Sequence, residues 1–167
     1  MKLPGWIVLT LGFAAVAPLQ AQYVGQLTGN VGVGSGVGQG SGGTSIGLNV
    51  SLAFWTRILS LGPEGLYQGL GNGRSALAVG GVLRVPVGGH RVRPYLVMSL
   101  GYYSWRTPLL GNLDLFAGSA GLGAEVGSPT RKAVLVAETR FHSSLQNSGG
   151  GDTRRFLTLT GGVRLRW

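Results

Sequence analysis

The feature that most constrains this chain is an apolar–polar alternation with a period of two residues. Between Ile46 and Phe54 every even position is apolar and every odd position is small or polar. Near the C-terminus the same alternation places a second apolar set on one face: Leu157, Leu159, Val163, Leu165 and Trp167. Successive side chains of a β-strand point to opposite faces, so each such segment has one apolar and one polar face. The pattern predicts an all-β protein.

The alternation recurs often enough along the chain to predict eight strands. They lie near residues 23–33, 44–55, 58–68, 75–87, 92–105, 113–126, 133–142 and 155–167. Each is long enough for a tilted crossing of a bilayer, which needs about 9–11 residues. Longer loops alternate with shorter turns in this assignment, as in a barrel with its tight turns on the periplasmic side. We therefore predict an eight-stranded antiparallel up-and-down transmembrane β-barrel over residues 22–167.

Charged residues of the predicted strands identify the inner face of the barrel, because they occupy the alternate positions that are polar and not those that are apolar. This lumen set is Glu64, Arg84, Glu125, Glu138, Arg140, Arg164 and Arg166. A soluble barrel would have the reverse arrangement, with apolar residues inside. Eight strands enclose only enough space for side chains to fill, and a buried charge needs a partner. We therefore predict a salt-bridge network that closes the lumen; the alternative is a narrow path for protons or small ions.

Two specific contacts within this network follow from strand order. Glu64 is expected to meet Arg84 on the next strand, and Arg164 is expected to meet the Glu138 and Arg140 pair.

Aromatic residues lie near the ends of the predicted strands, where rings with polar tips suit the bilayer interface. Two girdles are predicted. The one at the shorter turns contains Tyr23, Phe54, Trp55, Tyr95 and Trp167, and the one at the longer loops contains Tyr67, Tyr102, Tyr103, Trp105, Phe116, Phe141 and Phe156. The segment Tyr95–Met98 is apolar at every position, so its sequence does not tell which of its side chains face inward.

The N-terminal residues 1–21 have the pattern of a secretory signal peptide. Lys2 forms the positive region, an apolar stretch runs from Leu3 to Val16, and cleavage is expected after Ala21. The alternative is a membrane anchor, for which the stretch is short against the roughly 20 apolar residues of a spanning helix.

Composition excludes several other classes of protein and site. The 32 glycines argue against a helical bundle, and the absence of cysteine removes disulfides and thiolate metal sites. Only two histidines are present, so a His-based metal cluster is not expected. The glycine-rich residues 34–43 lack the Lys-Ser/Thr of a phosphate-binding P-loop. We expect no cofactor and no nucleic-acid partner, because the net charge of +9 is dispersed along the sequence.

Several phrases of the sequence resemble those of a known family. They are Leu61-Gly-Pro-Glu64, Arg93-Pro-Tyr95, Leu100-Gly-Tyr102, Glu138-Thr-Arg140-Phe-His142 and the C-terminal Gly162-Val-Arg-Leu-Arg-Trp167. With the signal pattern and eight alternating strands, the chain resembles the small outer-membrane β-barrel proteins of the OmpA/OmpX type. The resemblance implies a location in the bacterial outer membrane. It also implies that the outer-membrane assembly machinery reads the last strand through Leu157, Leu159, Val163, Leu165 and Trp167.

The leading functional hypothesis is a non-enzymatic outer-membrane protein with a structural or surface-interaction role. Four arginines lie at the strand ends next to the longer predicted loops. They could bind the phosphates of lipopolysaccharide, because the planar guanidinium group matches the geometry of an oxyanion. They are Arg74, Arg106, Arg154 and Arg155. A solvated basic rim is the alternative explanation for these four residues.

A hydrolase is the alternative from another class. His142, Ser144 and Asp152 loosely resemble the catalytic residues of outer-membrane lipid A 3-O-deacylases, with Ser144 as nucleophile, His142 as base and Asp152 orienting it. The sequence departs from that pattern because Leu145 stands where an Asn is typical and Asp152 lies in a glycine-rich loop. His142 occupies an even position like Glu138 and Arg140, so its side chain is expected to face the lumen and not a lipid substrate.

Overall fold

The structure is a computed structural model that describes residues 24–37, 45–55, 59–89, 91–107, 111–128, 131–145 and 155–167. Eight strands account for most of them: β1 (Val24–Gly36), β2 (Ser45–Trp55), β3 (Ser60–Gly71), β4 (Arg74–Pro86), β5 (Val92–Thr107), β6 (Gly111–Val126), β7 (Ala133–Ser144) and β8 (Arg155–Arg166). The predicted signal segment, Tyr23, Asp152 and Arg154 lie outside the described residues, as does the side chain of Trp55.

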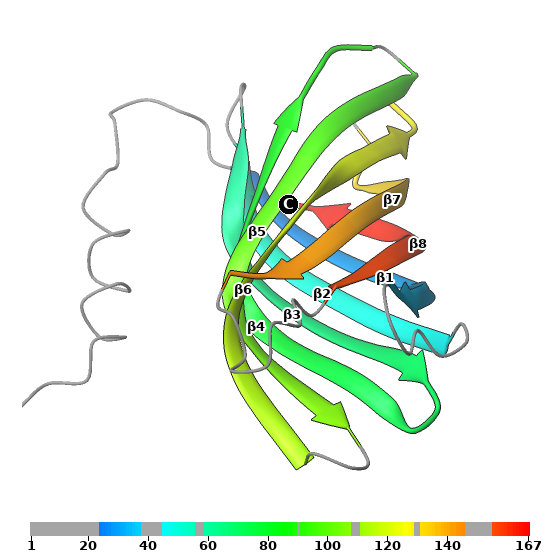
Figure 1. The fold of residues 1–167 in the computed structure, drawn as a ribbon. Helices are drawn as coiled ribbons and strands as arrows, with labels where there is room; N and C mark the ends of the chain where they lie inside the picture. Colours follow the sequence, from blue (N-terminus) through cyan, green and yellow to red (C-terminus); the bar gives the residue numbers. More distant parts are fainter. Residues whose placement is uncertain are drawn as a thin grey trace, which may run out of the picture.

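The strands form one closed antiparallel barrel in sequence order (Figure 1). The first and last strands complete the closure, with Leu27 opposite Leu165 and Val33 opposite Leu159. Two backbone hydrogen bonds of 3.1 Å between Gly25 and Trp167 extend this seam to the end of the chain. The predicted eight-stranded up-and-down barrel is confirmed.

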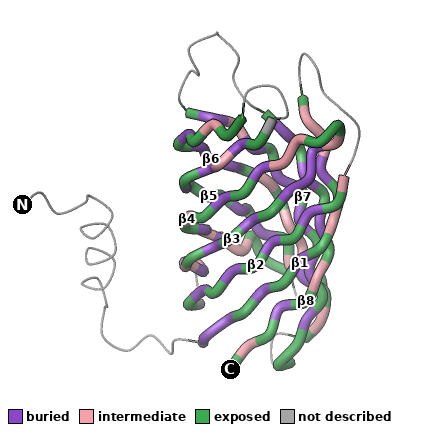
Figure 2. The backbone as a smooth tube through the Cα atoms, turned by 90° about the horizontal axis from the view of Figure 1, so that it is seen from below, coloured by how far each residue is buried: buried purple, intermediate pink, exposed green. Residues whose placement is uncertain are grey.

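Each strand alternates between buried and exposed residues along its length, as Figure 2 shows in purple and green. In β7 the even positions from Val134 to Ser144 are all buried, and odd positions such as Leu135 and Phe141 are exposed. The exposed face carries large apolar side chains on every strand. The buried face carries most of the charged residues of the strands. This is the arrangement that a barrel needs when lipid surrounds it.

The connections correct one part of the sequence interpretation. The alternation of loops and turns predicts a longer loop between β3 and β4, yet these strands are joined by only two residues, Asn72 and Gly73. Both have positive φ angles, 51° and 70°, which is the requirement of the tight hairpin turn that an Asn-Gly pair favours. The β5–β6 connection is also short, at residues 108–110. Long loops therefore do not separate every pair of strands on that side of the barrel.

We call the end with the β1–β2, β3–β4, β5–β6 and β7–β8 connections the loop side, and the opposite end the turn side. No helix in the described part of the chain is long and apolar enough to cross a membrane.

Candidate functional site

The barrel interior, or lumen, contains two side-chain assemblies of different chemistry. Charged residues fill the middle and the turn side, and aromatic residues fill the loop side. Both assemblies follow from strand parity, since every member occupies an inward position of its strand.

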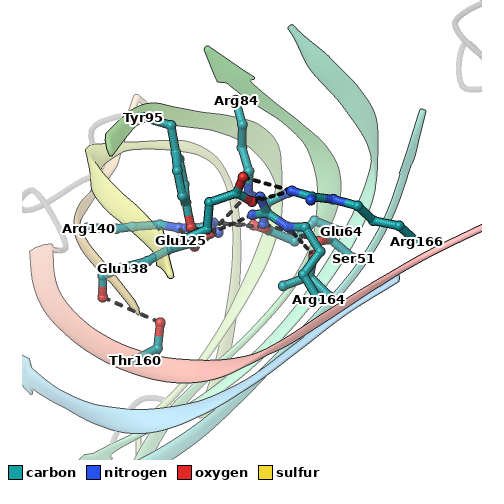
Figure 3. Close-up of polar contacts among 11 residues, drawn as sticks. Ser51, Glu64, Arg84, Tyr95, Glu125, Glu138, Arg140, Thr160, Arg164 and Arg166 are labelled. Carbon is teal, nitrogen blue, oxygen red and sulfur yellow. Dashed lines mark hydrogen bonds and ion pairs between the residues drawn. The ribbon is translucent and has the colours of Figure 1, made fainter. Parts of the chain in front are cut away.

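The central cluster joins four charged residues from three strands (Figure 3). Arg140 of β7 donates two hydrogen bonds from Nη1 to the carboxylate of Glu64 on β3, at 2.7 and 2.8 Å. Its Nε donates to Oε2 of Glu138 at 2.8 Å, and its Nη2 also contacts that oxygen. Arg84 of β4 donates from Nε to Oε1 of Glu138 at 2.9 Å and from Nη2 to Ser51 at 3.1 Å. Two guanidiniums and two carboxylates therefore neutralise one another inside the lumen.

Tyr95 of β5 also belongs to the central cluster, although its place near a strand end predicts it in the lipid-facing girdle. Its hydroxyl donates a 2.7 Å hydrogen bond to Oε1 of Glu138, and its ring lies beneath the guanidinium of Arg164, 5.0 Å from the ring centre. The ring occupies the place where any side chain at Gly123, the residue opposite on β6, would begin. Glycine at this position therefore allows the tyrosine to lie across the barrel wall.

A second charged cluster surrounds Glu125 of β6 toward the turn side. Arg164 of β8 donates from Nη1 to Glu125 at 2.7 Å and from Nε to Thr28 of β1 at 3.0 Å. Arg166 contacts both oxygens of Glu125 at 2.6 and 2.7 Å. Arg93 of β5, opposite Glu125 in the register, adds an ion pair at 2.5 Å. One carboxylate thus binds three guanidiniums, and Arg93 is a member absent from the predicted lumen set.

An aromatic assembly occupies the loop side of the lumen. His142 of β7 stacks on Phe156 of β8 with ring centroids 4.2 Å apart and planes inclined by 5°. Trp105 packs edge-on against Phe156 at 5.2 Å, and Tyr103 stacks with Trp105 at 6.2 Å. Buried Leu and Ala side chains from β3, β4 and β6 complete this packing.

The aromatic assembly corrects the predicted girdles. Four residues predicted in the lipid-facing girdles are buried in the lumen instead: Tyr95, Tyr103, Trp105 and Phe156. A residue near a strand end lies close to the membrane interface, but whether its side chain faces lipid or lumen depends on whether its position is odd or even. In β5 the odd positions face the lumen. Tyr67, Tyr102, Phe141 and Trp167 are exposed on the outer face, as a girdle requires.

Charged residues on neighbouring strands do contact each other, but at longer distances than the charged residues that meet across the lumen. Glu64 and Arg84 approach to 3.7 Å, and Arg164 and Glu138 to 3.8 Å. The shorter contacts cross the lumen: Arg140 reaches Glu64, and Arg84 reaches Glu138. Strand order predicts neighbours around the wall, and only barrel closure brings opposite walls together.

The loop-side arginines do not share one face. Arg106 and Arg155 are exposed on the outer face, with β6 and β7 between their strands. Arg74 begins β4 at an inward position and is only partly exposed. The apolar residues proposed for recognition by the assembly machinery, Leu157, Leu159, Val163, Leu165 and Trp167, are all exposed on the outer face.

The residues considered for hydrolysis are placed as their parity predicts. His142 is 1% exposed and faces the lumen. Its Nδ1 lies 3.0 Å from the Tyr103 hydroxyl, and its Nε2 lies 3.2 Å from the Thr158 hydroxyl. Ser144 is also buried, on the same face of β7. Both ring nitrogens therefore have partners other than Ser144. Among the described residues, no group of His, Cys, Asp or Glu is arranged to hold a metal ion.

Comparison with known proteins gives the same fold. The chain is similar to the crystal structure of Neisserial surface protein A, with a TM-score of 0.64 and 14% identity over 86% of this chain and 97% of that one. It is also similar to the N-terminal β-barrel domain of Pseudomonas aeruginosa OprF, with a TM-score of 0.59 and 12% identity over 89% of this chain and 100% of that one. No protein-family model and no curated protein sequence matches it. With its lipid-suited outer face and charged interior, the chain therefore has the fold of the small eight-stranded outer-membrane β-barrels.

Proposed function

We propose that this protein is an integral, non-enzymatic barrel of the bacterial outer membrane, with a lumen closed by its own side chains and a structural or surface-interaction role. The observation that carries the proposal is the filled interior. The central cluster spans the barrel axis, and the aromatic assembly packs above it toward the loop side. The apolar outer face and the fold shared with outer-membrane barrels support the location.

The number and direction of the contacts support a closed lumen. Arg84 and Glu138 are 1% exposed and Arg140 is 3% exposed, so water has little access to the central cluster. Their hydrogen bonds connect β3, β4, β5 and β7 across the lumen. A solute could pass only if several charge-assisted hydrogen bonds broke together, and each of these is stronger than a neutral one.

Conductance in planar lipid bilayers tests the closed lumen. We expect the folded wild-type barrel to show no steady, large single-channel current. The matched variant replaces Glu64, Glu138 and Arg140 with Ala, which removes side chains from the central cluster and should admit small ions if the barrel still forms. A difference in gel migration between boiled and unboiled samples shows that each barrel was folded. A large steady current through the wild-type protein would contradict closure.

On the outer face, we propose that Arg106 and Arg155 contact lipopolysaccharide phosphates. The support is their exposure at the loop side, where this lipid would lie if the tight turns face the periplasm. Because the two residues lie on separated strands, they would contact different lipid molecules. Replacing both with Gln should reduce the lipopolysaccharide that co-purifies with the barrel, while replacing Arg131 at the turn side with Gln should not. Equal amounts in all three proteins would contradict the contact.

The outer face of β8 supports recognition by the assembly machinery. Its outward apolar side chains are Leu157, Leu159, Val163 and Leu165, with Gly161 between the two pairs, and Trp167 follows at the end. Replacing Leu165 and Trp167 with Ser should lower the amount of inserted barrel in outer-membrane fractions, whereas refolding into detergent should be affected less. An unchanged level of inserted protein would remove this proposal.

A further inference from the structure

The turn side of the barrel carries many more basic than acidic side chains. Among the residues that the structure describes, six cations lie there: Arg91, Arg93, Arg131, Lys132, Arg164 and Arg166. The described residues hold four acidic side chains in all. Two belong to the central cluster, and Asp114 lies near the loop-side start of β6. Glu125 is the acidic side chain that remains for these six cations. The charge that is dispersed along the sequence is therefore concentrated at one end of the barrel.

The cluster around Glu125 differs in charge balance from the central cluster. The central cluster pairs two guanidiniums with two carboxylates. Glu125 binds three guanidiniums, those of Arg93, Arg164 and Arg166, and Arg164 has one further, longer contact of 3.8 Å with Glu138. Burial weakens solvent screening, so like charges held around one carboxylate repel more strongly than they would in water. An anion that joined the cluster would offset this repulsion.

Buried donors in this cluster lack an acceptor. Nε of Arg93 and Nη2 of Arg164 have no hydrogen-bond partner in the described part of the chain. Arg164 is 1% exposed, and its Nη2 comes no closer than 3.8 Å to the carboxylate of Glu138. A buried donor with no acceptor costs free energy, and such groups in folded proteins usually have a partner. Donors of this kind beside surplus positive charge are groups that an oxyanion could pair with.

One edge of the cluster reaches solvent, whereas Glu125 and Arg164 are buried. The side chain of Arg93 is 14% exposed, and Lys132 is exposed at the barrel rim. The backbone carbonyl of Lys132 accepts a 2.8 Å hydrogen bond from the amide of Arg166, which extends the β7–β8 pairing to the mouth. By its parity with the buried Val134, Lys132 occupies the next inward position at this end. A ligand can approach Lys132 and Arg93 before it reaches Arg164.

We propose that the turn-side mouth binds a phosphate-class oxyanion, held by Arg93, Arg164 and Lys132. The planar guanidinium fork matches the geometry of phosphate oxygens, and the lysine adds a point charge. The same chemistry is offered by inorganic phosphate and by the headgroup of an anionic phospholipid. This site lies at the opposite end from the proposed lipopolysaccharide contacts.

Calorimetric titration of inorganic phosphate and pyrophosphate into the folded barrel tests the site. The barrel is held in nanodiscs of phosphatidylcholine, and sodium chloride keeps the ionic strength constant. We expect saturable binding to the wild-type protein, weakened about tenfold or more by Arg93→Gln, which loses one charge-assisted fork. Arg131→Gln removes the same charge at the same end of the barrel from a residue outside the proposed site, and it should bind phosphate nearly as the wild type does. No binding to the wild type, or equal binding to both variants, would overturn the proposal.

A second variant is expected to bind phosphate more tightly than the wild type, not more weakly. Glu125→Gln removes the carboxylate that competes with the ligand for the three guanidiniums, so phosphate should bind more tightly. If that variant does not give a heat-modifiable folded band, the comparison of Arg93→Gln with Arg131→Gln decides the question. Weaker phosphate binding by folded Glu125→Gln would count against the proposed arrangement.

Nanodiscs that contain phosphatidylglycerol distinguish the two sources of the anion. If the headgroup occupies the site, the wild-type protein should lose its phosphate signal in these nanodiscs and keep it in phosphatidylcholine. If the ligand is a free oxyanion, the signal should persist in both. The site is also separable from the proposed function, because a conducting wild-type barrel would contradict closure and leave the phosphate titration unchanged.

Discussion

The two halves of the lumen are built on the same strands by different kinds of contact. In β7, Glu138 and Arg140 enter the ionic half, whereas His142, one inward position further, stacks in the aromatic half. Ionic contacts need defined donors and acceptors from specified strands, and a missing partner leaves a buried charge. Aromatic contacts need volume and shape, which several side chains can supply. The ionic half should therefore tolerate substitution less well than the aromatic half.

The largest effect is expected from Glu138→Ala. This change leaves Arg84 and Arg140 buried without a shared acceptor, and loss of one partner from a buried ion pair costs about 3–5 kcal/mol. Urea-induced unfolding of the barrel in lipid vesicles, followed by tryptophan fluorescence, measures the change. Thr139→Ala, on the outer face of the same strand, should change the free energy of unfolding by less than about 0.5 kcal/mol. Similar losses in the two variants would contradict a special role for the ionic half.

Two inward tyrosines of β5 provide the sharpest comparison, because each loses only a hydroxyl. Tyr95→Phe removes a hydrogen bond to the charged Glu138 and should cost about 1.5–3 kcal/mol, whereas Tyr103→Phe removes one to His142 and should cost about 1 kcal/mol. The same urea unfolding experiment measures both. A larger loss for Tyr103→Phe would reverse the proposed difference between the halves.

The smallest effect is expected from His142→Phe in the aromatic half. The new ring can keep the stack on Phe156, while the hydrogen bonds of the imidazole to Tyr103 and Thr158 disappear. Both hydroxyls keep other partners, because Thr158 still donates to the carbonyl of Arg140 and Tyr103 still contacts Ser99 and Ser119. We therefore expect the free energy of unfolding to fall by about 1 kcal/mol or less. Mass spectrometry of lipid A, from cells that express either the wild type or this variant, should also show no difference in acylation. A 3-O-acyl chain missing only with the wild type would revive the hydrolase alternative.

Local periodicity was sufficient to predict much of the barrel. Alternation in β2, β7 and β8 predicted their faces, so the inward position of Glu138, Arg140 and Arg164 is as expected. Prediction was wrong where two signals compete. Trp105 lies near a strand end, which suggests a girdle, but its parity turns it inward. The tight hairpin at Asn72-Gly73 was also missed, even though this pair is the strongest short-range signal for such a turn.

The sequence pattern could not predict which charged side chains pair across the lumen. Arg84 and Glu138 are separated by 54 positions in the chain and lie on strands that are not neighbours. Nothing in the pattern around either residue specifies the curvature that brings them together. The third cation on Glu125, Arg93, was missed because the apolar run that follows it obscured the parity of β5.

What the sequence alone determined about this protein is the number of strands, their order and the chemistry of each face, because backbone geometry makes side chains alternate whatever the rest of the chain does. What only the tertiary structure decided is which inward side chains meet. Closing the barrel sets the distance and stagger between opposite walls, and those two quantities select a neutral cluster at the centre, an aromatic assembly at one end and surplus positive charge at the other.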